Sequence, residues 1–204
     1  MTKIILVRHG HVEGISPERF RGRADLLLTA EGRRQAEATA HRIEASRTPA
    51  AVYTSSLSRC RATGEAIGKP FGLSPNPIED LIDIDYGEWQ GLTPDGVRNR
   101  WPEQLETWYR APDWAAIPGG ETLQAVLSRA LSALREIIGR HPRDTVVVVG
   151  HDSVNRVLLL HALDLPLSRY WRLGQHPCAI NELDFSANGF SVLSMNETYH
   201  LNSA

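Results

Sequence analysis

Two histidines in this chain each stand at the end of a run of apolar residues. His9 follows Arg8 and the run at 3–7, and His151 directly follows the run at 145–150. Both runs are typical of buried strands in a parallel sheet. The carboxyl ends of such strands form the ligand crevice of an open α/β sheet. We therefore expect the two imidazoles, although far apart in sequence, to face each other across one catalytic site.

Arg59 is the third residue that could take part in this chemistry. A short strand is expected at 51–54, and Ser55 or Ser56 is expected to cap the helix after it, so Arg59 falls in the first helical turn. A cation there opposes the helix dipole by some tenths of a kcal/mol. It becomes favourable when an anion shares that helix end, because the free N–H groups bind phosphate. Taken alone, Arg59 fits a solvent-exposed surface position equally well. Because Arg8 and Arg59 each come just after a predicted strand, a role for Arg59 in the anion site is favoured.

Two arginines, two histidines and a helix N-terminus at one sheet edge would form a pocket for a dianion. One neutral imidazole can attack phosphorus while the other donates a hydrogen bond to the phosphoryl oxygens. Bidentate arginine contacts neutralise the charge that spreads over those oxygens in the transition state. Histidine suits the nucleophile because it is partly neutral near pH 7 and forms a labile N–P bond.

The elements that must position these residues alternate between strand and helix. Apolar runs predict strands at 3–7, 51–54 and 145–150, and a further strand is expected at 72–78, between Pro70 and Glu79-Asp80. Helices are expected after Thr29, after Ser55-Ser56, after Thr122 and at 153–164. A final hairpin is expected, with strands near 179–185 and 190–195 and a turn at Asn188-Gly189. This order predicts a three-layer α/β/α sandwich with a mostly parallel sheet.

The regular pattern stops between Asp83 and Gly120, where four of the five tryptophans occur. We expect residues 1–204 to form a single domain, with a small cap inserted at about 83–120. The tryptophans fit either an aromatic substrate pocket under the cap or the cap's own core. The second is favoured, because a short insertion needs large side chains to bury enough area.

Composition and charge narrow the function. A net charge of −2 gives no support for binding to nucleic acid or to an anionic membrane. Cys60 and Cys178 have neither a disulfide pattern nor metal-ligand spacing, and Cys60 is expected to be a buried thiol. No apolar run approaches the roughly 20 residues of a membrane span, and the N-terminus enters a strand without a signal peptide. We expect a cytoplasmic protein that acts on a small molecule without cofactor or metal. The oligomeric state stays open.

The sequence resembles the histidine phosphatases, also called the phosphoglycerate-mutase-like superfamily. Arg-His-Gly alone would be a weak signal, but six matching segments occur in the family's order over most of the chain. They are Leu-Val-Arg-His-Gly at 6–10, Asp-Leu-Leu-Leu-Thr-Ala-Glu-Gly at 25–32 with Gln35 and Ala36, Ser-Ser-Leu-Ser-Arg-Cys-Arg-Ala-Thr at 55–63, Gly-Glu-Trp-Gln-Gly at 87–91, Gly-Gly-Glu-Thr at 119–122 and Val-Val-Gly-His at 148–151. The resemblance implies that His9 is the phosphorylated nucleophile. It also implies that Arg8, Arg59 and His151 complete the phosphate pocket.

Two carboxylates compete for the role of general acid. The resemblance places the acid two residues after Leu81, at Asp83, where most relatives carry the longer Glu. The other candidate is Asp152, at a position where the phosphoglycerate mutase branch usually has Gly. The acid phosphatase and phytase branch has an Asp there that protonates the leaving group. The segment Gly-Glu-Trp at 87–89 matches the first branch and favours Asp83.

The loop after the nucleophile departs from the family's pattern. Val12 replaces a common Thr or Ser, and Ile15 stands where many relatives have Asn, so two polar contacts are missing. Loop arginines could replace the lost polarity, although Arg23 is expected at the surface. The expected substrate-binding set is Arg8, Arg19, Arg21, Gly22, Arg59, His151 and Asp152.

Three other functions are less consistent with the sequence. In metal-dependent phosphohydrolases with a His-Asp ligand pair, that pair lies within a helix, whereas His151-Asp152 follows a strand. A phosphoglycerate mutase would need extra basic residues in the cap, where the cations are Arg98, Arg100 and Arg110 and the mutase Arg-Arg pair is absent. A non-enzymatic phospho-ligand binding module would not need the whole catalytic set. The sequence therefore favours a cofactor-independent phosphomonoesterase, with its natural substrate open.

Overall fold

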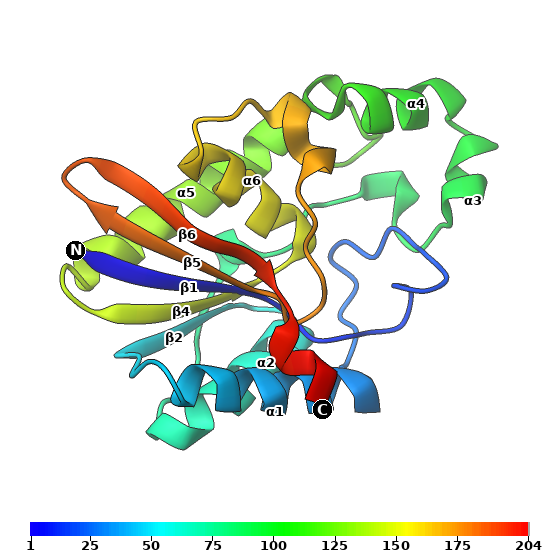
Figure 1. Ribbon diagram of the computed structural model, residues 1–204. Coiled ribbons are helices and arrows are strands. Elements are labelled where there is room, and N and C mark those ends of the chain that lie inside the picture. Colours follow the sequence, from blue (N-terminus) through cyan, green and yellow to red (C-terminus); the bar gives the residue numbers. More distant parts are fainter. Residues whose placement is uncertain (204) are drawn as a thin grey trace.

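A mixed six-stranded sheet forms the centre of the protein, whose computed structural model describes residues 1–203 (Figure 1). The strand order is β3-β2-β4-β1-β5-β6. Strands β3, β2, β4 and β1 pair in parallel, whereas β5 pairs antiparallel with both β1 and β6. The prediction of a mostly parallel sheet is confirmed. The strands are β1 (Thr2–Arg8), β2 (Ala51–Ser55), β3 (Asn76–Ile78), β4 (Thr145–Gly150), β5 (Ile180–Ser186) and β6 (Gly189–Glu197).

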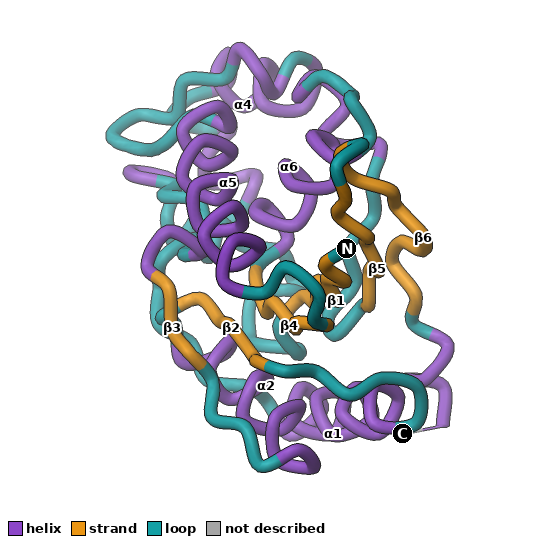
Figure 2. The backbone as a smooth tube through the Cα atoms, turned by 90° about the vertical axis from the view of Figure 1, so that its left-hand side faces the viewer, coloured by secondary structure: helices purple, strands orange, loops and turns teal. Residues whose placement is uncertain are grey.

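Helices cover both faces of this sheet, which confirms the predicted three layers (Figure 2). Helices α1 (Ala30–Glu44) and α2 (Ser58–Gly68) lie on one face, and α5 (Leu123–Arg140) and α6 (Asp152–Ala162) lie on the other. Alternate residues of β1 therefore enter different cores: Ile5 packs with α1 and α2, and Leu6 packs with α5 and α6. Burial on both faces explains why β1 and β4 are continuous apolar runs.

The helix N-termini are capped differently from one another. Thr29 caps α1 as expected, its Oγ1 accepting a hydrogen bond from the backbone N–H of Gly32 at 3.1 Å. The prediction that Ser55 or Ser56 caps α2 is wrong, because α2 begins at Ser58. The carboxylate of Asp25 accepts hydrogen bonds from both the N–H and the hydroxyl of Ser58, each at 2.8 Å. A residue from a distant loop thus replaces the local cap, and Arg59 remains in the first turn.

The third strand is shorter than predicted. The sequence predicts a strand over 72–78, but β3 covers only Asn76–Ile78. A 3-10 helix at Lys69–Phe71 directly precedes the expected strand and ends at Gly72, which has a φ of 67°. This left-handed conformation suits glycine and turns the chain before it can extend.

The segment 83–120 contains no strand and holds α3 (Pro94–Arg98) and α4 (Pro102–Arg110) beyond the carboxyl ends of the parallel strands (Figure 1). Trp89 and Trp108 are fully buried and belong to the same apolar cluster as Leu6 of β1. Trp114, by contrast, is 81% exposed. The partly buried Trp101 packs against this cluster as well, so three of the four tryptophans extend the main core and do not form a separate one.

Two further expectations concern the thiols and the membrane. Cys60 and Cys178 are free and buried, and burial raises the pKa of each thiol to about 12. Both thiols are therefore protonated near neutral pH. Within residues 1–203, no helix is both long enough and apolar enough to span a bilayer.

Candidate active site

Strands β1 and β4 end at the same level and bring the two histidines together. Arg8 is in register with Gly150, and the backbone N–H of His9 donates to the Gly150 carbonyl at 3.0 Å. The centroids of the His9 and His151 rings lie 5.2 Å apart at an interplanar angle of 63°. Both side chains are buried. The predicted proximity of the two imidazoles is confirmed.

The turn after β1 fixes the orientation of the His9 ring and determines which ring nitrogen carries the proton. Its Nδ1 lies 2.7 Å from the carbonyl oxygen of Gly10. Because a carbonyl only accepts, the ring proton belongs on Nδ1, and the lone pair of Nε2 is left free. Burial, followed by the positive charge of Arg59, holds the pKa of His9 well below its usual 6.5. His9 is therefore a neutral imidazole with an available nucleophilic nitrogen.

Arg59 is a fully buried cation whose donors are held by the loop after β1. Its guanidinium donates to the carbonyls of Ala24 at 2.6 Å and Gly22 at 2.7 Å. It also contacts the Asp83 carboxylate at 3.2 Å, and its Nε donates to His151 Nδ1 at 3.3 Å. Gly22, expected among the substrate-binding residues, thus supplies a carbonyl that supports Arg59.

His151 has both ring nitrogens engaged. Its Nδ1 accepts from Arg59, so the ring proton lies on Nε2, which donates to Ser55 Oγ at 2.8 Å. Burial and the charge of Arg59 lower the pKa of His151 well below its usual value. The expected hydrogen bond from His151 to a phosphoryl oxygen would therefore require a second ring proton or a turn of the ring.

Arg8 lies beside the same histidines and is only 6% exposed. One of its terminal nitrogens donates to the Gln175 carbonyl and lies 3.8 Å from Asp152 Oδ1. Its Nε is buried without a hydrogen-bond partner among the described residues. A buried charged donor of this kind is well suited to an anion.

The two candidate acids have different surroundings. Asp83 Oδ1 accepts from the Ser153 hydroxyl and from the N–H of Ile84, whereas Oδ2 faces Arg59 and lies 3.6 Å from His151 Nδ1. Asp152 is the first residue of α6, and its Oδ1 accepts from Arg156 Nε at 2.9 Å. Asp83 thus contacts the arginine–histidine pair directly, and Asp152 is held by a second cation.

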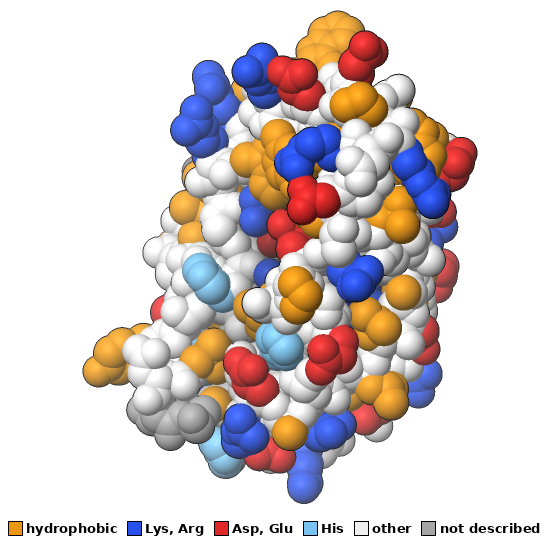
Figure 3. All heavy atoms as spheres, turned by 90° about the vertical axis from the view of Figure 1, so that its right-hand side faces the viewer, with side chains coloured by type: hydrophobic (Ala, Val, Ile, Leu, Met, Phe, Trp, Pro, Cys, Tyr) orange, Lys and Arg blue, Asp and Glu red, His pale blue; other side chains and the backbone are white. Residues whose placement is uncertain are grey.

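A cavity of about 230 Å³ opens above these groups. Basic and acidic side chains are mixed on the face that carries the carboxyl ends of the parallel strands (Figure 3). His9, Arg59 and His151 are buried and are not among its lining residues, but Arg59 and His151 both contact Asp83, which is. Arg23 instead pairs with Asp85 and Glu121 and is 37% exposed. The lining residues are Arg8, Ile15, Glu18, Arg19, Phe20, Arg21, Gly22, Asp83, Tyr86, Asp152, Ser153, Arg156 and Trp171.

Sequence reasoning does not identify six of these lining residues: Glu18, Phe20, Tyr86, Ser153, Arg156 and Trp171. The guanidinium of Arg156 lies 5.1 Å from the ring centroids of Tyr170 and Trp171, which fixes its orientation. One signal was available, because Arg156 follows Asp152 by four residues and so shares its helix face. The turn that carries Trp171 packs on α6 through tertiary contacts alone, so no local pattern could have revealed it.

Metal-ligating side chains do not cluster in the part of the chain that the structure describes. No group of three or more His, Cys, Asp or Glu side chains there could hold a metal ion. His151 is the N-cap of α6 and Asp152 begins that helix, so the pair lies at a strand–helix junction.

Residues 4–198 match the family model described as histidine phosphatase superfamily (branch 1). The chain is 30% identical over 201 residues to phosphoserine phosphatase 1 of Hydrogenobacter thermophilus, covering 98% of this chain and 95% of that protein. It is 35% identical over 169 residues to the 2,3-bisphosphoglycerate-dependent phosphoglycerate mutase of Brucella ovis, covering 79% of this chain and 81% of that one. The solved structure of Bacillus stearothermophilus YhfR has a TM-score of 0.94 at 30% identity and covers 98% of this chain and 100% of its own. The chain belongs to branch 1 of the histidine phosphatase superfamily.

The depressed histidine pKa values predict a specific pH response of the free protein. His9 and His151 should remain neutral as the pH falls through 6.5, because burial and Arg59 disfavour the imidazolium. Imidazole NMR signals of the two rings should therefore keep neutral-ring chemical shifts at about pH 6. In the unfolded chain the same rings take up protons near 6.5, so stability should decline as the pH drops below that value. A half-titration of either ring near pH 6.5 would contradict this assignment.

The buried position of Arg59 predicts a large effect on anion binding. Arg59→Ala should weaken vanadate binding and lower kcat by about 100- to 1000-fold, because charge-assisted donors in a desolvated site are lost. Arg61→Ala is the matched control, since Arg61 lies on the same helix and is exposed. Circular dichroism and Tm, measured beside the kinetics, establish that both variants fold. Equal effects at the two positions would show that Arg59 has no special role.

Proposed function

We propose that this protein is a phosphomonoesterase that hydrolyses a small phosphorylated metabolite through a phosphohistidine on His9. The observation that carries the proposal is the free Nε2 of a neutral His9 beside the buried guanidinium groups of Arg8 and Arg59. Membership in the histidine phosphatase superfamily supports it. The cavity, at about 230 Å³, suits a small leaving group.

In the first half-reaction, His9 Nε2 attacks phosphorus. The N–P bond forms as the bond from phosphorus to the ester oxygen breaks. Arg8 and Arg59 neutralise the charge on the phosphoryl oxygens, and the protonated carboxyl of Asp83 gives its proton to the leaving oxygen. In the second half-reaction, the Asp83 carboxylate takes a proton from water, whose oxygen attacks phosphorus. The N–P bond breaks, inorganic phosphate leaves, and His9 returns to its neutral form.

Asp83 is the preferred acid, and Asp152 is the alternative. Both carboxylates line the cavity, but Asp83 Oδ2 adjoins Arg59 and His151, where the transferring group would be bound. Asp152 is held through the same oxygen by Arg156 at 2.9 Å and faces Arg8 at 3.8 Å. We assign Asp152 to fixing the orientation of these two arginines.

The positions of the arginines in segment 83–120 favour hydrolysis over mutase activity. A mutase needs cations that retain a bisphosphorylated intermediate. Arg110 pairs with Glu106 at 2.8 Å, Arg98 pairs with Asp95, and Arg100 lies over the ring of Trp101. These three arginines are not among the residues that line the cavity around Asp83, and the cations that line it come from other segments.

The covalent intermediate is open to direct test. Rapid quenching during turnover of a ³²P-labelled phosphomonoester should trap label on His9 alone, stable in base and labile in acid, as expected for phosphohistidine. EDTA should not prevent labelling, because arginines supply the positive field that a metal would otherwise supply. His9→Ala should abolish the label, and Arg61→Ala should retain it. Label on another residue, or a strict need for a divalent ion, would refute the mechanism.

The choice of acid predicts a dependence on the leaving group. Asp83→Asn keeps the shape but cannot donate a proton, so it should slow hydrolysis of alkyl phosphates by about 100-fold or more. It should affect p-nitrophenyl phosphate far less, because that leaving group departs without protonation. Asp152→Asn is the matched comparison and should slow both substrates modestly and equally. The reverse pattern would show that Asp152, and not Asp83, is the general acid.

A further inference from the structure

The Gly-Gly-Glu-Thr segment at 119–122 contributes no group to the cavity. Its Glu121 nevertheless forms a bidentate ion pair with Arg129 of α5. Arg129 Nε donates to one carboxylate oxygen of Glu121 at 3.0 Å, and a terminal nitrogen donates to the other at 2.9 Å. The two side chains are only 15% and 19% exposed. Partial burial acts to raise the pKa of Glu121, but the hydrogen bonds from Arg129 and from the N–H of Asp85 outweigh it and lower that pKa. The pair is therefore ionised.

The same guanidinium holds the backbone that leads into Asp83. Arg129 donates to the carbonyls of Asp80 at 2.9 Å and Asp83 at 3.1 Å, and also to that of Ile82. On the far side of Asp83, the N–H of Asp85 donates to Glu121 at 3.0 Å, and the N–H of Glu121 donates to the Asp85 carbonyl at 2.9 Å. The chain is thus fixed both before and after Asp83.

Glycines allow this close backbone contact. A Cβ at Gly120 would lie 2.6 Å from the Asp85 carbonyl oxygen, and one at Gly87 would lie 2.2 Å from the Pro118 carbonyl oxygen. Any larger residue would push segments 85–88 and 118–121 apart. Gly87 of the Gly-Glu-Trp-Gln-Gly motif and Gly120 of the Gly-Gly-Glu-Thr motif are therefore both required by the contact between these two segments.

Arg23 connects the loop after β1 to the same carboxylate. It lies 3.2 Å from Glu121 and 3.5 Å from Asp85. Its neighbours Gly22 and Ala24 supply the carbonyls that hold Arg59. Glu121 is therefore shared by the segment that carries Asp83 and the loop that supports Arg59.

We propose that Arg129 and Glu121 are positioning residues that set the reach of the Asp83 carboxyl toward the leaving-group oxygen. The proposal rests on the role of Asp83 proposed above. Aspartate is one methylene shorter than glutamate, so its reach depends on where the backbone places it. A displacement of about 1 Å at a reacting group can cost about 100-fold in rate. Arg129 and Glu121 fix that placement from both sides of Asp83.

The test compares Arg129→Gln with wild type on two substrates. Hydrolysis of an alkyl phosphate should slow by about 10- to 100-fold, because the acid is misplaced. Hydrolysis of p-nitrophenyl phosphate should change far less. In an Asp83→Asn background, Arg129→Gln should cause no further loss on the alkyl phosphate, because residues that act through one group are not additive.

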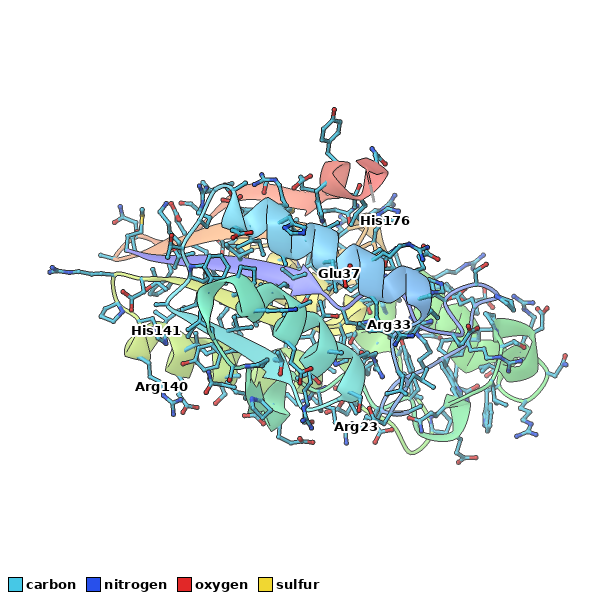
Figure 4. All side chains as sticks on the ribbon, turned by 90° about the horizontal axis from the view of Figure 1, so that it is seen from below. Arg23, Arg33, Glu37, Arg140, His141 and His176 are labelled. Atoms are coloured by element: carbon cyan, nitrogen blue, oxygen red, sulfur yellow. The ribbon has the colours of Figure 1, made fainter. Side chains whose placement is uncertain are left out.

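Two further variants on α5 separate positioning from general stability. Arg140→Gln removes an exposed cation that pairs with Glu136 and lies apart from Arg23 (Figure 4), and should alter neither rate. Leu134→Ala opens the buried face of the helix and should lower Tm without changing the ratio of the two rates.

Arg129→Lys provides a second test of the same position if the Gln variant does not fold. It keeps the charge but lacks the planar fork, so it should show the same leaving-group-selective loss to a smaller degree.

The outcomes distinguish this proposal from the proposed function. If Asp83→Asn is selective for the alkyl phosphate but neither Arg129 variant is, the positioning role is wrong while the acid assignment stands. Equal slowing of both substrates, or additivity with Asp83→Asn, also overturns it. If Asp83→Asn itself is unselective, the acid assignment and the positioning role fail together.

Discussion

The fully buried guanidinium of Arg59 is the constraint on which the rest of the site depends. A buried charge is strongly destabilising unless it is paired and its donors are satisfied. Here the satisfaction comes from three separate segments: the carbonyls of Gly22 and Ala24, the carboxylate of Asp83, and the ring of His151. Strand β2 and helix α2 place the arginine, and the other segments fold around it. A positive charge is thereby fixed next to Asp83, which lines the cavity, before any substrate arrives.

The same charge controls the histidines. After burial itself, Arg59 is the largest cause of the lowered pKa of both His9 and His151. A neutral His9 is a nucleophile and an imidazolium is not. The residue that would bind the phosphoryl group therefore also keeps the attacking nitrogen unprotonated, which links binding and reactivity through one side chain.

Much of this arrangement could be predicted from the sequence because it depends on local pattern. Apolar runs located β1 and β4, and parallel pairing brought His9 to His151. The features that were missed depend on contacts between distant segments. Asp25 caps α2 across the fold, β3 extends only over the three residues that pair with β2, and Arg156 is oriented by rings from a turn outside its own helix. Apolar periodicity carries no information about such contacts.

Charge balance gives a physical reason why this site suits a phosphate dianion. The charged residues that line the cavity are Arg8, Arg19, Arg21, Arg156, Glu18, Asp83 and Asp152. With Arg59, which pairs with Asp83, the site has five cations and three carboxylates and so two net positive charges. A phosphate dianion would bring that sum to zero. Because neither buried imidazole has to carry part of the positive charge, His9 can lie beside a dianion and still keep the neutral ring that a nucleophile needs.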